Sequence, residues 1–145
     1  MSFWLEGWIE VARLPDTDGE HAWFGVVDLG SLIDVADADT ERLFGLSKWC
    51  VTGKESVDAL AASRGLPLNP SEQVRRELDR IAAHEAIYGS GEFGGYTYAI
   101  WSEIRGYELT VPPEDSQWKL AFALARVLEV QFGPDRVRFV VWFNW

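Results

Sequence analysis

The residues with the clearest chemical potential lie in one stretch, GGYTYAIWSEIRGY at 94–107. Two glycines precede aromatic side chains that can stack on a ligand and form hydrogen bonds with it, and Glu103 stands among these rings. Burial among the rings would raise the pKa of this carboxyl, and perturbed carboxylates are typical of functional sites. The same residues would also suit an ordinary strand end that packs against a core, so both interpretations stay open.

From this stretch and its surroundings we expect a binding surface of aromatic rings, one carboxylate and one arginine: Trp8, Tyr96, Tyr98, Trp101, Glu103 and Arg64. The planar guanidinium of Arg64 can hold a phosphate or a carboxylate, or it can bond backbone carbonyls and fix its own connecting segment. Trp4 and Trp142 belong to the same aromatic set. This set has three alternative roles: packing in the core, burial between subunits, or contact with a ligand or partner.

Catalytic and metal-binding motifs are absent from the sequence. It contains no GxGxxG, GxxxxGK[ST] or GxSxG motif, and its two histidines and one cysteine lie far apart. We therefore predict no catalytic residue, metal or cofactor. The remaining enzymatic alternative is a small hydrolase that uses Glu10, Glu103 and His84, which requires these groups to converge around one cleft.

The formal net charge of −10 indicates what kind of partner the chain can take. Such a charge repels nucleic acid and favours a basic protein surface, although it also serves solubility alone. The single cysteine, Cys50, excludes an intrachain disulfide. The opening MSFWLEGWIEV does not resemble a signal peptide, and no apolar stretch approaches the roughly 20 residues of a membrane span. We expect a cytoplasmic protein that does not associate with membranes.

Three segments of the sequence are expected to form β-strands. In 3–11 the alternation places Trp4, Glu6, Trp8 and Glu10 on one face, which predicts a half-exposed surface of tryptophans and carboxylates. Residues 22–30 form the returning strand after a turn at 14–21. The segment 137–145 is apolar on both faces, which predicts a central strand.

Helices are expected in four places, and a further strand at 96–104 runs into a helical turn. The expected helices are one capped by Asp39 or Thr40, one from Glu55 or Ser56 to Gly65, one capped by Ser71, and one from Pro113 or Glu114 to Gly133. This order predicts a single α+β domain over 1–145, with an antiparallel or mixed sheet and helices mainly on one face.

Several segments resemble a widespread family of small uncharacterised phage and prophage proteins. RGLPLNPSEQV at 64–74 resembles the family's RGLP-x-x-x-S-x-x-V segment, and ERLFGLS resembles its Y-x-LF-x-x-L segment. The opening MSFWLEGWIEVAR is similar to MGCDIHxYVEVR, GGYTYAIWSEI stands where the family has HSHSWLTLxEL, and PDRVRFVVWFNW is similar to DVRIVFWFDN.

The departures from this pattern fall on the family's polar positions. Its Asp and His near the start correspond to Trp4 and Glu6, its two later histidines to Gly94 and Tyr96, and its last Asp to Asn144. Four of its charged residues are retained: Glu10, Arg64, Glu103 and Arg138.

The resemblance implies a non-enzymatic accessory protein from a phage or mobile element. It would bind a basic host-protein surface or a nucleotide-like signal and so counter a host defence. A structural protein whose tryptophans lie between the subunits of a homo-oligomer is the other alternative.

Overall fold

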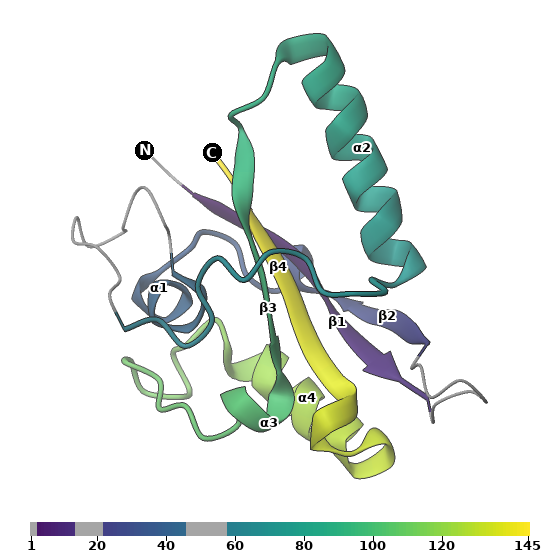
Figure 1. Ribbon diagram of the computed structural model, residues 1–145. Coiled ribbons are helices and arrows are strands. Elements are labelled where there is room, and N and C mark those ends of the chain that lie inside the picture. The colour runs from purple at the N-terminus through teal and green to yellow at the C-terminus, as the bar shows by residue number, and fades with distance from the viewer. Residues whose placement is uncertain (1–2, 14–21, 46–57) are drawn as a thin grey trace.

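The computed structural model describes residues 3–13, 22–45 and 58–145. The chain forms a four-stranded antiparallel sheet with the strand order β2-β1-β4-β3 (Figure 1). Its strands are β1 (Trp4–Ala12), β2 (Trp23–Asp28), β3 (Phe93–Ile100) and β4 (Val137–Asn144). Its helices are α1 (Ala38–Phe44), α2 (Glu72–Tyr88), α3 (Trp101–Ile104) and α4 (Lys119–Phe132), with short 3-10 turns η1 (Leu29–Ser31) and η2 (Pro134–Arg136). The prediction of a single α+β domain is confirmed.

The C-terminal strand β4 lies between β1 and β3, as its sequence predicts. It is buried along almost its whole length, because helices cover both faces of the sheet. Phe139, Val141 and Phe143 point into the larger core, whereas Val140 and Trp142 point into the smaller one. A strand with two apolar faces is stable only in such a position.

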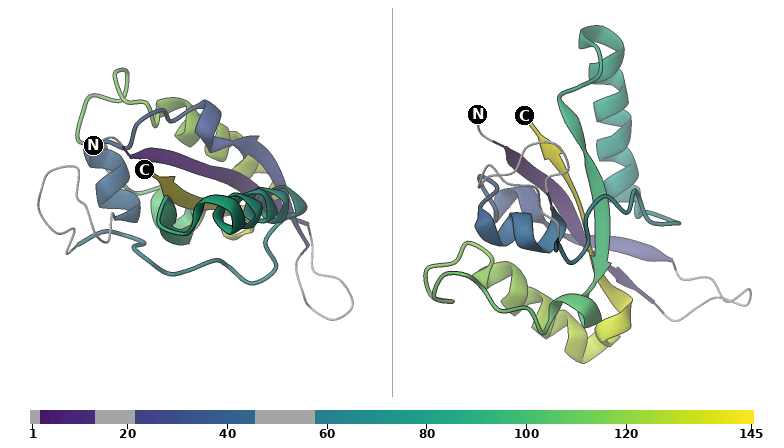
Figure 2. Two further views of the ribbon diagram at one scale, coloured as in Figure 1. Left: turned by 90° about the horizontal axis from the view of Figure 1, so that it is seen from above. Right: turned by 60° about the vertical axis from the view of Figure 1, so that its left-hand side comes forward.

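The helices divide unequally between the two faces. The larger core joins the sheet to α1, α3 and α4, in agreement with the expectation that helices lie mainly on one face. Among the described elements, α2 is the longest helix and the one that packs on the other face, and Figure 2 (left) shows it across the sheet from α4. The space between α2 and the sheet therefore holds its own apolar cluster, which includes Val74 and Ile81 of the helix.

Helix α2 begins as the sequence predicts. The Ser71 side chain accepts a hydrogen bond from the backbone N–H of Val74, which satisfies one of the free donors of the first turn. The backbone N–H of Ser71 donates to the Glu10 carboxylate at 2.6 Å, so the start of the helix is also tied to β1.

Three helix expectations need correction. Residues 58–64 form turns because their backbone bonds to α1, through Leu60 N–H to Arg42 O and Ala61 N–H to Leu43 O. The expected start of this helix, at Glu55 or Ser56, lies outside the described residues. Cys50 and the expected turn at 14–21 also lie outside them. Helix α1 is capped by Asp37, whose carboxylate accepts from Thr40 N–H. Helix α4 begins at Lys119, later than predicted, since residues 113–118 form turns.

Candidate functional site

A cleft of about 470 Å³ opens between β1, α2 and the corner where β2 meets η1. Its aromatic walls come from Trp4 and Trp8 of β1 and Trp142 of β4. Trp4 is 45% exposed at the mouth, whereas Trp142 is fully buried. The volume falls in the range of small-ligand and side-chain sites.

The pleat of β1 places these groups together. Trp4, Glu6 and Trp8 alternate along the strand, so their side chains share one face, as predicted. Trp142 stands directly across from Glu6 on β4, and its indole Nε1–H donates to the Glu6 carboxylate at 2.8 Å. One carboxylate is thereby held between tryptophan rings.

Negative charge dominates the lining of the cleft. Four carboxylates and one guanidinium line it, which gives a formal charge of −3: Glu6, Asp28, Asp34, Glu77 and Arg80. The Arg80 guanidinium bonds the Glu77 carboxylate at 2.8 Å and reaches Glu6 at 3.4 Å. These two carboxylates, Glu77 foremost, raise the pKa of Arg80.

Asp34 lies at the rim of the cleft, in a segment that runs beside β1 and holds it in place. Val35 forms an isolated antiparallel bridge with Trp4, and the Gln117 side chain bonds both Asp34 N–H and Val35 O. The Asp34 carboxylate is exposed and has no hydrogen-bond or ion-pair partner among the described residues. Asp28 differs, because its carboxylate accepts from Gly30 N–H.

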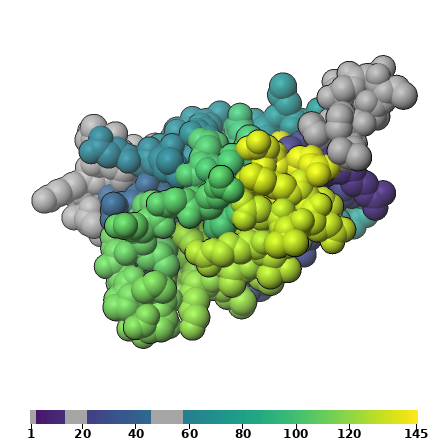
Figure 3. Space-filling model, turned by 90° about the horizontal axis from the view of Figure 1, so that it is seen from below, coloured from purple at the N-terminus to yellow at the C-terminus, as the bar shows by residue number. Residues whose placement is uncertain are grey.

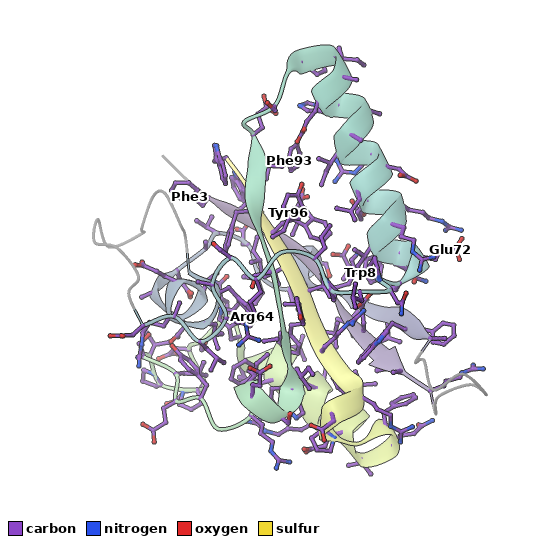
Figure 4. The ribbon with its side chains drawn as sticks, viewed as in Figure 1. Phe3, Trp8, Arg64, Glu72, Phe93 and Tyr96 are labelled. Carbon is purple, nitrogen blue, oxygen red and sulfur yellow. The ribbon has the colours of Figure 1, made fainter. Side chains whose placement is uncertain are left out.

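The predicted aromatic residues divide between two cores. Trp8, Tyr96 and Tyr98 all pack under α2, and Figure 4 shows Trp8 and Tyr96 between this helix and the sheet. The Tyr96 ring lies 6.0 Å from that of Trp142. Burial, followed by the nearby charges of Glu85 and Glu6, raises the pKa of Tyr96, so its hydroxyl is neutral at physiological pH.

The expectation that Trp101 shares this surface needs correction. Its side chain is fully buried in the larger core, stacked on Phe139 and edge-on to Phe122, so no ligand reaches it. Tyr96 and Tyr98 share one face of β3, whereas Trp101 follows Ala99 into the larger core on the opposite face. The alternation of side chains along a strand therefore indicates this separation from the sequence alone.

Arg64 and Glu103 form a two-point ion pair, with nitrogen–oxygen distances of 3.1 and 2.9 Å. Arg64 also donates to the backbone carbonyls of Leu60 and Tyr98. The hydrogen bond from Arg64 lowers the pKa of Glu103, which reverses the rise expected from its aromatic neighbours. Arg64 therefore fixes the connector to the end of β3, apart from Trp8 and Tyr96 (Figure 4).

A second, deeper ion pair joins the two central strands. The Arg138 guanidinium bonds the Glu10 carboxylate at 2.6 Å, and both side chains are almost completely buried. Arg138 also bonds the carbonyl of Asn69 and lies over the Trp23 ring. Burial lowers the pKa of Arg138. Glu10, Arg64, Glu103 and Arg138 are the charged residues that the resemblance to phage proteins retains. In the structure they form two ion pairs, Arg64–Glu103 and Arg138–Glu10.

The hydrolase alternative requires Glu10, Glu103 and His84 to converge, and each bonds a different partner. Glu10 is enclosed with Arg138, Glu103 is held by Arg64, and His84 Nε2 lies 2.7 Å from a Glu92 oxygen. Glu10 is fully buried, so its carboxylate does not open onto a cleft beside the other two. This arrangement counts against the hydrolase hypothesis.

Several residues of the cleft were not predicted. Asp28, Asp34 and the Glu77–Arg80 pair of α2 come from three places in the chain, and no local spacing connects these three places. The alternation in β1 was the one available signal, and it supplies Trp4, Glu6 and Trp8.

No protein-family model, curated protein or solved structure matches this chain. Over the described ranges, no group of three or more His, Cys, Asp or Glu side chains is placed to hold a metal ion. None of the described helices has the length and apolar character needed to cross a membrane.

Proposed function

We propose that this protein acts by binding, and that its cleft receives a cationic side chain from a basic protein surface. The observation that carries the proposal is the lining of the cleft, which combines tryptophan rings with carboxylates that one arginine only partly neutralises. Cations are attracted both to the faces of tryptophan rings and to carboxylates.

An arginine side chain suits the cleft best. Its guanidinium is flat, weakly hydrated and able to stack on an aromatic ring while it bonds a carboxylate. The exposed Asp34 carboxylate and the ring of Trp4 stand at the mouth, where an entering group would meet them first.

The charge of the cleft distinguishes the two kinds of partner that the sequence left open. A nucleotide brings phosphates, which three uncompensated negative charges would repel. A basic surface is attracted by the same charges and by the net charge of −10. We therefore favour the basic protein over the nucleotide-like signal.

The resemblance to phage proteins supports a site at this place. Trp4, Glu6 and Asn144 occupy positions where that family carries Asp and His, and all three line the cleft. A role against host defences is the setting that this resemblance suggests, and the proposed basic partner would then be a host protein.

A peptide titration tests the proposal. We expect a hexa-arginine peptide to quench or shift the tryptophan fluorescence with saturation. A hexa-citrulline peptide, which has the same shape without the charge, should not bind. The double variant Glu6→Gln/Asp34→Asn should weaken arginine-peptide binding about tenfold, because it removes two of the charges that face the cation.

The matched control removes two carboxylates from α2 outside the cleft, as Glu72→Gln/Asp79→Asn, and should change affinity by less than about twofold. Equal losses in the two double variants would mean that net charge alone attracts the peptide. Binding of ATP in preference to the arginine peptide would overturn the proposal in favour of a nucleotide site.

A further inference from the structure

A second pocket, of about 400 Å³, lies between α4 and the loop that follows α3. Tyr107, Leu109, Pro113 and Phe122 provide its apolar lining. Figure 3 views the molecule from below and shows this loop (green) beside the surface of α4 (yellow-green). The pocket does not share a lining residue with the cleft under α2.

The wall formed by the loop is fixed in place. The buried Asp39 carboxylate accepts hydrogen bonds from the Tyr107 hydroxyl and from both the N–H and the hydroxyl of Thr110. Burial, together with Asp39, raises the pKa of Tyr107, so its hydroxyl stays protonated and bonded. The Arg42 guanidinium lies 5.3 Å from the centre of the Tyr107 ring. A pocket with walls held in this way is largely preformed.

Positive charge borders this apolar space, in contrast to the rest of an acidic molecule. Lys119 and Arg126 line the pocket from positions about two turns apart on α4, and neither side chain has an ion-pair or hydrogen-bond partner among the described residues. The first turn of α4 holds no acidic residue, so Lys119 adds to the positive end of the helix. Glu108 is the single acidic residue in the lining.

We infer that this pocket binds a small organic acid, in which a carboxylate is joined to an aromatic or branched apolar body. The apolar body enters between Tyr107 and Phe122, and the carboxylate meets Lys119 and Arg126. Charged donors of this kind recognise carboxylates through charge-assisted hydrogen bonds. The size of the pocket fits a ligand of this class.

The test compares 1-naphthaleneacetate with 1-naphthaleneacetamide, its neutral analogue, in NMR titrations of the ¹⁵N-labelled protein. We expect the acid to shift the backbone signals of Tyr107, Leu109 and Phe122 with saturation, with a dissociation constant on the order of 1 mM or lower. The amide should bind at least about tenfold more weakly, since it lacks the charge.

The double variant Lys119→Gln/Arg126→Gln should weaken binding of the acid about tenfold and leave the amide unchanged. Arg75→Gln/Arg76→Gln removes two cations from α2 as the matched control and should change little. Equal binding of acid and amide, equal losses in both double variants, or no saturable shift of the pocket signals would each overturn the inference. None of these results bears on the acidic cleft, whose signals come from other residues.

Discussion

At the scale of single residues, the buried Glu10–Arg138 pair is the most consequential polar contact in the described structure. It joins β1 to β4 and, through the Ser71 N–H, to the start of α2. We expect Glu10→Gln to lower the free energy of unfolding by about 3–5 kcal/mol, because it leaves a buried guanidinium without its counter-charge. Urea denaturation at neutral pH measures this loss.

Glu72→Gln is the matched comparison, because Glu72 pairs with Arg76 on the surface of α2. Exposed pairs of this kind contribute about 0–1 kcal/mol. If the two variants lost equal stability, the buried pair would not have the role assigned to it.

The Arg64–Glu103 pair predicts a dependence on pH. Arg64 lowers the pKa of Glu103 in the folded protein. Stabilisation by this pair is therefore complete above the unfolded-state pKa of about 4.3, and is lost as pH falls through the lower folded-state pKa.

We expect Glu103→Gln to reduce the free energy of unfolding by about 1 kcal/mol at pH 7, since the pair is partly exposed. The difference from the natural protein should shrink as pH falls below about 4. Urea denaturation at pH 7 and at acid pH measures both values. A difference that stays constant or grows toward acid pH would contradict the assigned charge state.

At the scale of secondary-structure elements, the close approach of β1 to β4 depends on Gly7. Its φ is +155°, and a Cβ at this position would stand 2.1 Å from the backbone oxygen of Val140. We expect Gly7→Ala to destabilise the fold by about 3 kcal/mol, because two backbone segments would have to separate. The thermal midpoint of unfolding measures this effect.

Gly106→Ala serves as the control, since a Cβ at Gly106 meets no atom within 4 Å. It should leave the midpoint within a few degrees. Similar midpoints for both variants would show that β1 and β4 can move apart at Gly7 with little loss of stability.

Elements with strong local signals were predictable from the sequence. The Ser71 cap and the apolar period of the following helix identify α2, and the two apolar faces of 137–145 identify a central strand. Residues 58–64 have a helical pattern, yet they pair with α1, because tertiary hydrogen bonds outweigh weak local propensity.

The site was predictable only in part, because tertiary structure, and not local sequence, brings most of its residues together. Strand alternation brings Glu6 and Trp8 to one face, but Asp28, Asp34 and Glu77 reach the cleft through the arrangement of whole elements. The assignment of Trp101 to the same surface was wrong, and strand alternation explains why: Trp101 follows Ala99 into the larger core, opposite to Tyr96 and Tyr98.

At the scale of the whole molecule, the two pockets have opposite charge. The cleft under α2 has a formal charge of −3, whereas the pocket beside α4 is bordered by Lys119 and Arg126. We expect binding of an arginine-rich partner to weaken several-fold between about 0.05 and 0.3 M salt, because screening acts on exposed charges. Affinity that does not depend on salt would indicate an apolar contact instead.

The central claim, that a cation enters the acidic cleft, is tested most directly by the indole Nε1–H signals of the tryptophans. Trp142 donates to Glu6, whereas Trp118 donates to Thr40 in the opposite core. On titration with the hexa-arginine peptide, we predict that the Trp142 signal shifts with saturation and the Trp118 signal does not. A Trp142 signal that stays unchanged while the peptide binds would contradict the account.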